Sequence, residues 1–205
     1  MPTRITETTA DAIGPWFAPT SADPAGAVAF LAELADRVTH RRGTGRVFVP
    51  GGGPVAGALA GEGYRVTDGT DRTDGTAGTD GPLGSGPRFD VVFSGSDELA
   101  RLLAQRDQLR LVRRLAAFLR PGGALVIQGR HPDPAAWARD ALVADHDPLR
   151  QTLLLAGARF PQRYVWPAEL DLMAELAGLA PEGCWGGWYG EPVVCGGVVV
   201  SVFRS

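Results

Sequence analysis

The feature that most constrains the fold is a strand-like segment that runs into three consecutive glycines and then into small residues. Residues 46–60 read RVFVPGGGPVAGALA, in which Gly51, Gly52 and Gly53 follow an apolar run and Pro54 stands at the first turn of an expected helix. A strand, a glycine turn and a helix in this order are typical of a cofactor-binding turn. The same order also serves as a plain connector, so the turn by itself leaves both interpretations open.

Strand and helix patterns alternate through the following residues. Apolar runs predict strands at residues 47–49, 64–67, 89–93 and 124–128. A helix is expected after the cap pair Asp23–Pro24, and another carries Leu111, Leu115 and Leu119 until LRPGG stops it. This alternation predicts an α/β fold with a Rossmann-like, doubly wound parallel sheet.

The pattern changes after Ala141. Strands are expected at residues 150–156, 162–166 and 197–203, with a helix at 167–178, and together they predict an antiparallel edge built from the C-terminus. At 205 residues the chain suits a single domain, 1–205, with an N-terminal extension at 1–22. Residues 68–88 hold one large apolar residue, Leu83, which predicts a flexible surface loop.

Composition excludes several classes of protein. The formal charge is −3, and no basic stripe is interleaved with aromatic residues, so nucleic-acid binding is not expected. We expect a cytoplasmic protein without a membrane contact, because no segment has the pattern of a signal peptide or a membrane span. Cys184 and Cys195 lie outside any metal-ligand spacing, which predicts two buried reduced thiols and no metal site.

Five segments together carry a family resemblance: VFVPGGGPVAGALAGEGYRVT, PRFDVVF, LRPGGALVI, the PDP that follows it, and YVWPAELDLMAELAGL. In combination they resemble class I S-adenosylmethionine-dependent methyltransferases, particularly the small-molecule type common in actinobacterial secondary metabolism. The resemblance implies the methyltransferase type of doubly wound sheet. Function does not follow from fold alone.

The chain departs from that family at the cofactor motif. The resemblance implies an acid two residues before the first glycine and a further glycine two after the last, where this chain has Val49 and Val55. It also implies an acid at the end of the second strand to hold the ribose, and in register that position is Thr70. These departures, with the loop at 68–88 in place of part of the cofactor region, predict that no cofactor is used. S-adenosylmethionine, held by Gly51, Gly53 and Asp68, is the alternative.

Ligands of open parallel sheets bind beyond the carboxyl ends of the strands, which here means the turns after residues 49, 93 and 128. Gly51, Gly52, Gly53 and Ser94 are therefore candidate substrate-binding residues. His131 is the candidate general acid or base, because its pKa lies near neutrality. Two carboxylates at the same edge are further catalytic candidates that could instead cap helices: Asp97 and Asp133.

The segment CWGGWYGEP gathers aromatic residues around one carboxylate, Glu191. Trp185, Trp188 and Tyr189 suit a pocket for an apolar or cationic small molecule, with Glu191 as a catalytic candidate. The same cluster could instead pack the core or a partner subunit.

The preferred hypothesis is a methyltransferase-like protein of secondary-metabolite biosynthesis that no longer transfers methyl groups. It would promote a cyclisation, pericyclic or by intramolecular displacement to a small ring, because a held geometry accelerates intramolecular reactions. An active small-molecule methyltransferase and a non-catalytic scaffold subunit are the alternatives. A small-molecule substrate is expected in either enzymatic case, and a related protein subunit or a second copy is a possible partner.

Overall fold

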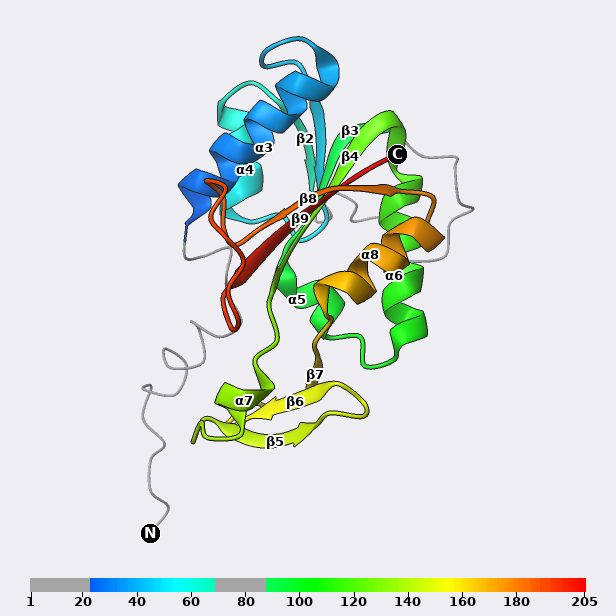
Figure 1. Cartoon of the computed structure of the whole chain (residues 1–205). Coiled ribbons are helices and arrows are strands. Elements are labelled where there is room, and N and C mark those ends of the chain that lie inside the picture. The colour runs from blue at the N-terminus through cyan, green and yellow to red at the C-terminus, as the bar shows by residue number, and fades with distance from the viewer. Residues whose placement is uncertain (1–22, 69–87) are drawn as a thin grey trace.

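A six-stranded mixed sheet forms the centre of the molecule (Figure 1). The computed structural model describes residues 23–68 and 88–205. The strand order is β2-β1-β3-β4-β9-β8: the neighbours from β2 to β4 pair parallel, and β9 pairs antiparallel with both β4 and β8. The bounds are β1 Arg46–Val49, β2 Arg65–Asp68, β3 Phe89–Ser94, β4 Leu119–Arg130, β8 Ala180–Trp185 and β9 Val198–Arg204. This topology confirms the predicted α/β class and the antiparallel C-terminal edge.

Helices cover both faces of this sheet. α3 (Pro24–Thr39) and α4 (Pro54–Gly61) pack with one core cluster, whereas α5 (Ser96–Ala100), α6 (Gln105–Ala117) and α8 (Pro167–Leu176) pack with the other. Figure 1 shows α3 and α4 to one side of the strands and α6 and α8 to the other. All six residues of β3 are buried, including the polar Asp90 and Ser94, as expected for a strand covered on both faces.

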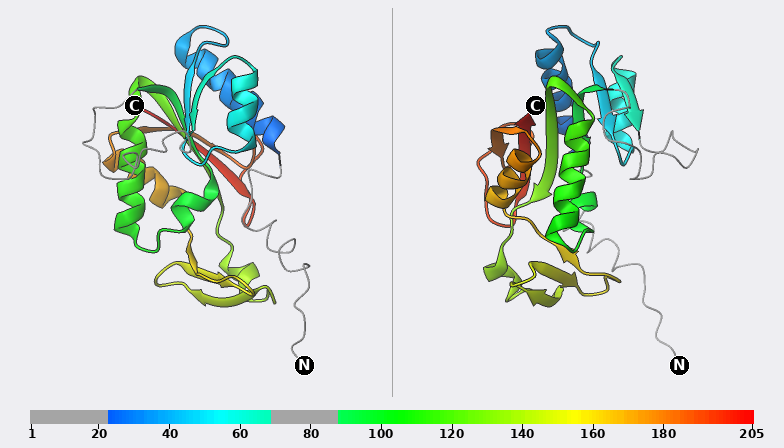
Figure 2. Two further views of the ribbon diagram at one scale, coloured as in Figure 1. Left: turned by 180° about the vertical axis from the view of Figure 1, so that it is seen from behind. Right: turned by 90° about the vertical axis from the view of Figure 1, so that its right-hand side faces the viewer.

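A second, small sheet follows β4 along the chain. After α7 (Pro134–Trp137), the strands β5 (Val143–Asp147), β6 (Thr152–Leu155) and β7 (Gln162–Arg163) pair antiparallel in sequence order. Both views of Figure 2 show this sheet at one end of the main sheet. Two strands predicted after Ala141 therefore lie here, outside the main sheet.

Two predicted segments fall largely outside the described residues. The N-terminal extension at 1–22 and positions 69–87 of the predicted loop are not described, so those predictions stay untested. The two ends of that loop are placed: Asp68 is the last residue of β2, and the Arg88 guanidinium donates a hydrogen bond to the Ala117 carbonyl at 2.6 Å. Among helices of the described ranges, none is long and apolar enough to cross a bilayer.

Tyr64 connects α3 to the start of β2. Its hydroxyl donates to Asp36 Oδ1 at 2.8 Å, and its ring is 7 % exposed in the core. Burial, and after it the Asp36 carboxylate, raises the pKa of Tyr64 to about 12 from the ordinary value of 10.0. The folded protein therefore holds this proton at a pH at which the unfolded chain has released it.

We expect the stability of the protein to fall between pH 10 and 12 in part through Tyr64. In this window the native state binds more protons than the unfolded state, so the free energy of unfolding decreases by up to about 1.4 kcal/mol per pH unit from this group. The contribution is complete below pH 10. Urea unfolding at pH 9 and pH 11 should show a smaller loss in Tyr64→Phe than in the wild type, and equal losses would contradict the assignment.

Candidate functional site

The glycine turn connects β1 to α4 at the carboxyl edge of the sheet. Gly52 and Gly53 have φ angles of 60° and 86°, in the left-handed region that favours glycine. Gly53 is the N-cap of α4 and provides no side-chain cap, and a Cβ built there would meet nothing within 4 Å. The space on the Cβ side of Gly53 is thus clear of other described residues, which lets a ligand approach the backbone of the turn closely there.

Two carboxylates flank this turn. Asp68 pairs with Val49 in register, and a Cβ on Gly52 would lie 3.4 Å from Asp68 Oδ2. On the other flank, Glu98 of α5 accepts a hydrogen bond from the Ser94 hydroxyl at 3.1 Å, and a Cβ on Gly51 would lie 3.9 Å from Glu98 Oε1. The turn therefore faces acids from both β2 and α5.

The positions at which the family resemblance implies an acid and a glycine are apolar and buried. Val49 and Val55 are each 4 % exposed and belong to the core cluster under α3 and α4. Thr70, the position assigned to the ribose acid by register, lies outside the described residues. The carboxylate placed beside the glycine turn is instead Asp68.

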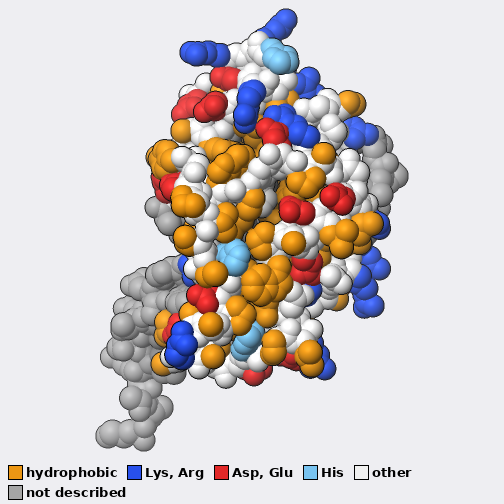
Figure 3. Space-filling view, viewed as in Figure 1, with side chains coloured by type: hydrophobic (Ala, Val, Ile, Leu, Met, Phe, Trp, Pro, Cys, Tyr) orange, Lys and Arg blue, Asp and Glu red, His pale blue; other side chains and the backbone are white. Residues whose placement is uncertain are grey.

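A cavity of about 100 Å³ lies where the carboxyl end of β4 meets α5, α8 and the small sheet. Its walls are mainly aliphatic and aromatic. Hydrophobic side chains also gather on the surface over the junction of the two sheets (Figure 3). The lining residues are Leu99, Ala100, Ile127, Gln128, Gly129, Arg130, Trp137, Leu153, Gln162, Arg163, Tyr164, Val165, Pro167, Leu170, Val199 and Ser201.

Several polar atoms of this lining are buried and have no hydrogen-bond partner among the residues that the structure describes. They are both amide atoms of Gln128, the indole Nε1 of Trp137 and the Oε1 of Gln162. Gln128 is 1 % exposed and Trp137 is 4 % exposed. Because buried polar groups are nearly always paired, these atoms indicate a place where a bound molecule or water completes the hydrogen bonds.

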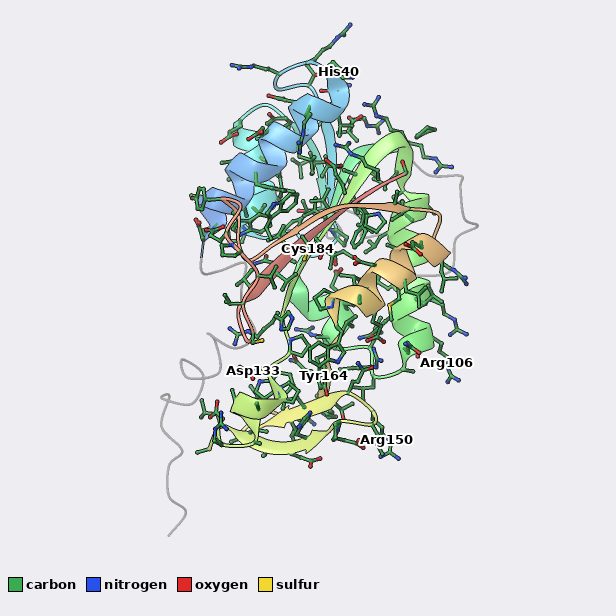
Figure 4. The ribbon with its side chains drawn as sticks, viewed as in Figure 1. His40, Arg106, Asp133, Arg150, Tyr164 and Cys184 are labelled. Carbon is green, nitrogen blue, oxygen red and sulfur yellow. The ribbon has the colours of Figure 1, made fainter. Side chains whose placement is uncertain are left out.

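Aromatic rings form the side of the cavity that faces the small sheet. Tyr164, labelled in Figure 4, packs against Trp137 with ring centroids 4.9 Å apart, and its hydroxyl lies 3.1 Å from His146 Nε2. Burial raises the pKa of Tyr164, so its phenol stays protonated at neutral pH. No motif in the sequence predicted that Gln128, Trp137 or Tyr164 belongs to a site. Two features of the sequence could have indicated them: Gln128, a glutamine at the end of the apolar run of β4, and the aromatic residues of the segment RYVW at 163–166.

The structure places the predicted catalytic residues of the β4 turn outside this lining. The His131 amide donates to the Gly197 carbonyl at 2.8 Å, and its ring meets Trp166 edge-on at 5.6 Å. Asp133 is the N-cap of α7 and accepts from the Ala136 amide at 3.0 Å, which is the capping role left open by the sequence. Asp97 lies within α5.

The aromatic C-terminal segment divides between core and surface. Trp188 is 6 % exposed and packs with half-buried Trp185 against Phe30 of α3. Tyr189 is 71 % exposed, and its amide donates to the Glu191 carboxylate at 2.9 Å. Glu191 is exposed in this turn, so the four residues do not face one common space.

The prediction of buried cysteines is wrong. Both cysteines are exposed: Cys184 lies on β8, an edge strand of the sheet (Figure 4), and Cys195 lies in the turn before β9. Among residues 23–68 and 88–205, no group of three or more His, Cys, Asp or Glu side chains could hold a metal ion.

Comparisons with known proteins identify relatives by structure. No protein-family model matches the chain, and no curated protein sequence matches it. The CcbJ methyltransferase from Streptomyces caelestis is similar, with a TM-score of 0.66 and 28% identity over 89% of this chain and 95% of that one.

Two further solved structures share the fold at lower identity. The sugar N-methyltransferase KedS8 from Streptoalloteichus has a TM-score of 0.60 at 18% identity, covering 100% of this chain and 96% of that one. The 1,6-didemethyltoxoflavin-N1-methyltransferase of Burkholderia thailandensis has a TM-score of 0.56 at 17% identity, covering 100% and 92%. The chain therefore has the fold of the class I S-adenosylmethionine-dependent methyltransferases, as the sequence motifs predicted.

Proposed function

We propose that the protein is an S-adenosylmethionine-dependent methyltransferase that acts on a small molecule. The observation that carries this proposal is the position of Asp68, an acid at the end of β2 that lies beside Gly52 of the glycine turn. The family holds the ribose of the cofactor with an acid at the end of the second strand. Asp68, the last residue of β2, is therefore the proposed ribose contact. The register of the sequence motif alone would have put that contact at Thr70.

The residues around the glycine turn fit the cofactor in most respects. Gly53 leaves open space beside the backbone at the start of α4, and Asp68, beside Gly52, can accept hydrogen bonds from ribose hydroxyls. When bound, S-adenosylmethionine supplies a methyl group on a positively charged sulfur. The Burkholderia thailandensis neighbour was solved with S-adenosylhomocysteine and its toxoflavin-type substrate, which supports a cofactor and a small acceptor on this fold.

The buried valines at positions 49 and 55 argue for weaker binding than an intact motif would give. They also motivate the cyclisation hypothesis, which stays a prediction, as does the scaffold hypothesis. A measurement of cofactor binding separates methyl transfer from both, because neither of the other functions requires the cofactor.

We expect S-adenosylhomocysteine to bind the full chain with a micromolar dissociation constant, and Asp68→Asn to weaken it about 10- to 100-fold. The reason is that hydrogen bonds to a charged group contribute roughly 1.5–3 kcal/mol. Isothermal titration calorimetry measures both constants. Asp145→Asn is the matched control, since Asp145 is an exposed carboxylate of β5 in the small sheet.

Binding no tighter than millimolar would exclude this function and favour the cyclisation or scaffold hypothesis. Micromolar binding that is equal in the wild type and Asp68→Asn would retain the cofactor but reject Asp68 as its ribose contact. The control variant should match the wild type in both cases.

A further inference from the structure

Three residues that line the cavity at the end of β4 have buried polar atoms with no hydrogen-bond partner among the described residues. These atoms are the Nε2 and Oε1 of Gln128, the indole Nε1 of Trp137 and the Oε1 of Gln162. Gln128 and Trp137 are more than nine-tenths buried. A buried donor or acceptor that lacks a partner costs free energy, so these groups indicate a guest that pairs with them.

The unpaired atoms divide evenly between donors and acceptors. Gln128 Nε2 and Trp137 Nε1 donate, whereas Gln128 Oε1 and Gln162 Oε1 accept. Trp137 belongs to one core cluster with Leu153, and Gln162 lies opposite Leu153 in the register of β6 and β7. The indole donor and the Gln162 acceptor therefore come from the same face of the small sheet. A guest that satisfies this set has both an acceptor and a donor.

The charged groups of the lining do not call for an ionic guest. Its two guanidinium groups are both engaged: Arg163 lies 2.7 Å from Glu169, and Arg130 also has an interaction of its own. Among the residues that the structure describes, no Asp or Glu lines the cavity to attract a cation. A neutral guest is therefore favoured, because a charge buried without a counter-charge is costly.

The size of the cavity limits the guest to a small ring or a small part of a larger molecule. A cavity of roughly 150 Å³ with apolar walls admits benzene, whereas this one measures about 100 Å³. A five-membered ring is of suitable size. α5 connects this place to the glycine turn, because Glu98 flanks the turn and the next two residues, Leu99 and Ala100, line the cavity.

We propose that this cavity binds a small neutral ring that contains an amide, with the guest carbonyl accepting from Gln128 Nε2 and the guest N–H donating to Gln128 Oε1. A carboxamide pairs with such an edge through two parallel hydrogen bonds, because its donor and acceptor are adjacent. The Trp137 indole donates to the second lone pair of the guest carbonyl. Gln162 Oε1 accepts from a water that bridges to the guest.

This inference rests on the proposed function, because it identifies the amide-bearing ring as part of the methyl acceptor. The experiment uses no S-adenosylmethionine, so its failure is distinguishable from a failure of cofactor binding. It compares three five-membered rings: 2-pyrrolidinone, cyclopentanone and pyrrolidine, which is protonated at neutral pH. Each is titrated into the full chain and followed by ligand-observed NMR.

The lactam 2-pyrrolidinone is expected to bind tightest. Cyclopentanone should bind about 2- to 10-fold more weakly, because it has the carbonyl but no N–H to donate to Gln128 Oε1. Protonated pyrrolidine should bind weakest, since it has no acceptor for the two donors and its charge would be buried without a counter-charge.

Two variants test the named contacts. Gln128→Leu should weaken the lactam about tenfold and remove its advantage over cyclopentanone, because both hydrogen bonds of the carboxamide are lost. Trp137→Phe should weaken both carbonyl probes by a similar factor, about 2- to 10-fold, because each of them accepts from the indole. The thermal midpoint of Gln128→Leu should be unchanged or higher, since the amide that it removes is unpaired, and this measurement shows that the variant folds.

Gln105→Leu is the control, because Gln105 is exposed at the start of α6 and does not line the cavity. Saturable lactam binding that both cavity variants weaken and the control retains supports the proposal. Three results would each overturn it: no saturable lactam binding, binding of pyrrolidine as tight as that of the lactam, or a preference for the lactam that persists in Gln128→Leu.

Discussion

Replacing Trp188 with alanine is expected to lower the free energy of unfolding by about 3–5 kcal/mol. The indole is 6 % exposed and packs between Phe30 of α3 and Phe93 of β3, with ring centroids 5.5 and 5.8 Å away. Truncation leaves a cavity in the cluster that joins α3 to the sheet, and close-packed surroundings collapse only partly to fill it. Urea unfolding followed by far-ultraviolet circular dichroism measures the loss.

Tyr189→Ala provides the matched control. Its ring follows directly in the sequence but is 71 % exposed, so the expected loss is below about 1 kcal/mol. Similar losses in the two variants would contradict the assignment of Trp188 to the core. A Trp188→Ala protein of unchanged stability that fails to associate with a partner would identify an interface anchor instead.

The contrast between Trp188 and Tyr189 shows that a cluster of aromatic residues in a sequence does not reveal which of them are buried. Glycines at 186, 187 and 190 let the chain turn sharply, so adjacent aromatic residues point to different environments. Sequence spacing predicts a common face only within a regular strand or helix. Residues 186–192 lie in neither, so the proposal that the segment lines a substrate pocket could not be judged from its composition.

Elements with a clear periodicity were predictable. The apolar runs of β1, β3 and the C-terminal half of β4 are buried where the sequence predicts, and Pro167 begins α8 as expected. β8 was not predicted, because Ala180–Trp185 has no apolar alternation and is held by its pairing with β9. Tertiary pairing thus creates a strand that local preference does not indicate.

The glycine turn and the cavity also differed in how far the sequence predicted them. The glycine turn was predictable, since its residues are consecutive and the strand before it is apolar. Asp68 became a candidate ribose contact only once β2 was seen to end there, beside Gly52. The cavity combines α5, β4, the small sheet and α8, so no contiguous motif records it.

A buried ion pair connects the small sheet to α8. Its disruption should also lower the free energy of unfolding strongly. Arg163 of β7 lies 2.7 Å from Glu169 of α8, with side chains 5 % and 13 % exposed. Glu169→Leu is expected to lower the free energy of unfolding by about 3–5 kcal/mol, because it leaves a buried guanidinium without its counter-charge. Urea unfolding measures this loss, and Asp107→Leu is the control: its pair with Arg110 spans 2.8 Å at the surface and should contribute at most about 1 kcal/mol.

The double variant Arg163→Met with Glu169→Leu decides whether the charge itself is responsible. When both ions are replaced by apolar groups of similar volume, neither desolvation cost remains, so the double variant should be more stable than Glu169→Leu alone. A coupling energy of about 2 kcal/mol or more is expected between the two sites. Gln108 and Gln151 also donate to or accept from this pair, so recovery should be incomplete. A double variant no more stable than Glu169→Leu would show that packing of α8 against the small sheet, rather than the buried charge, accounts for the loss.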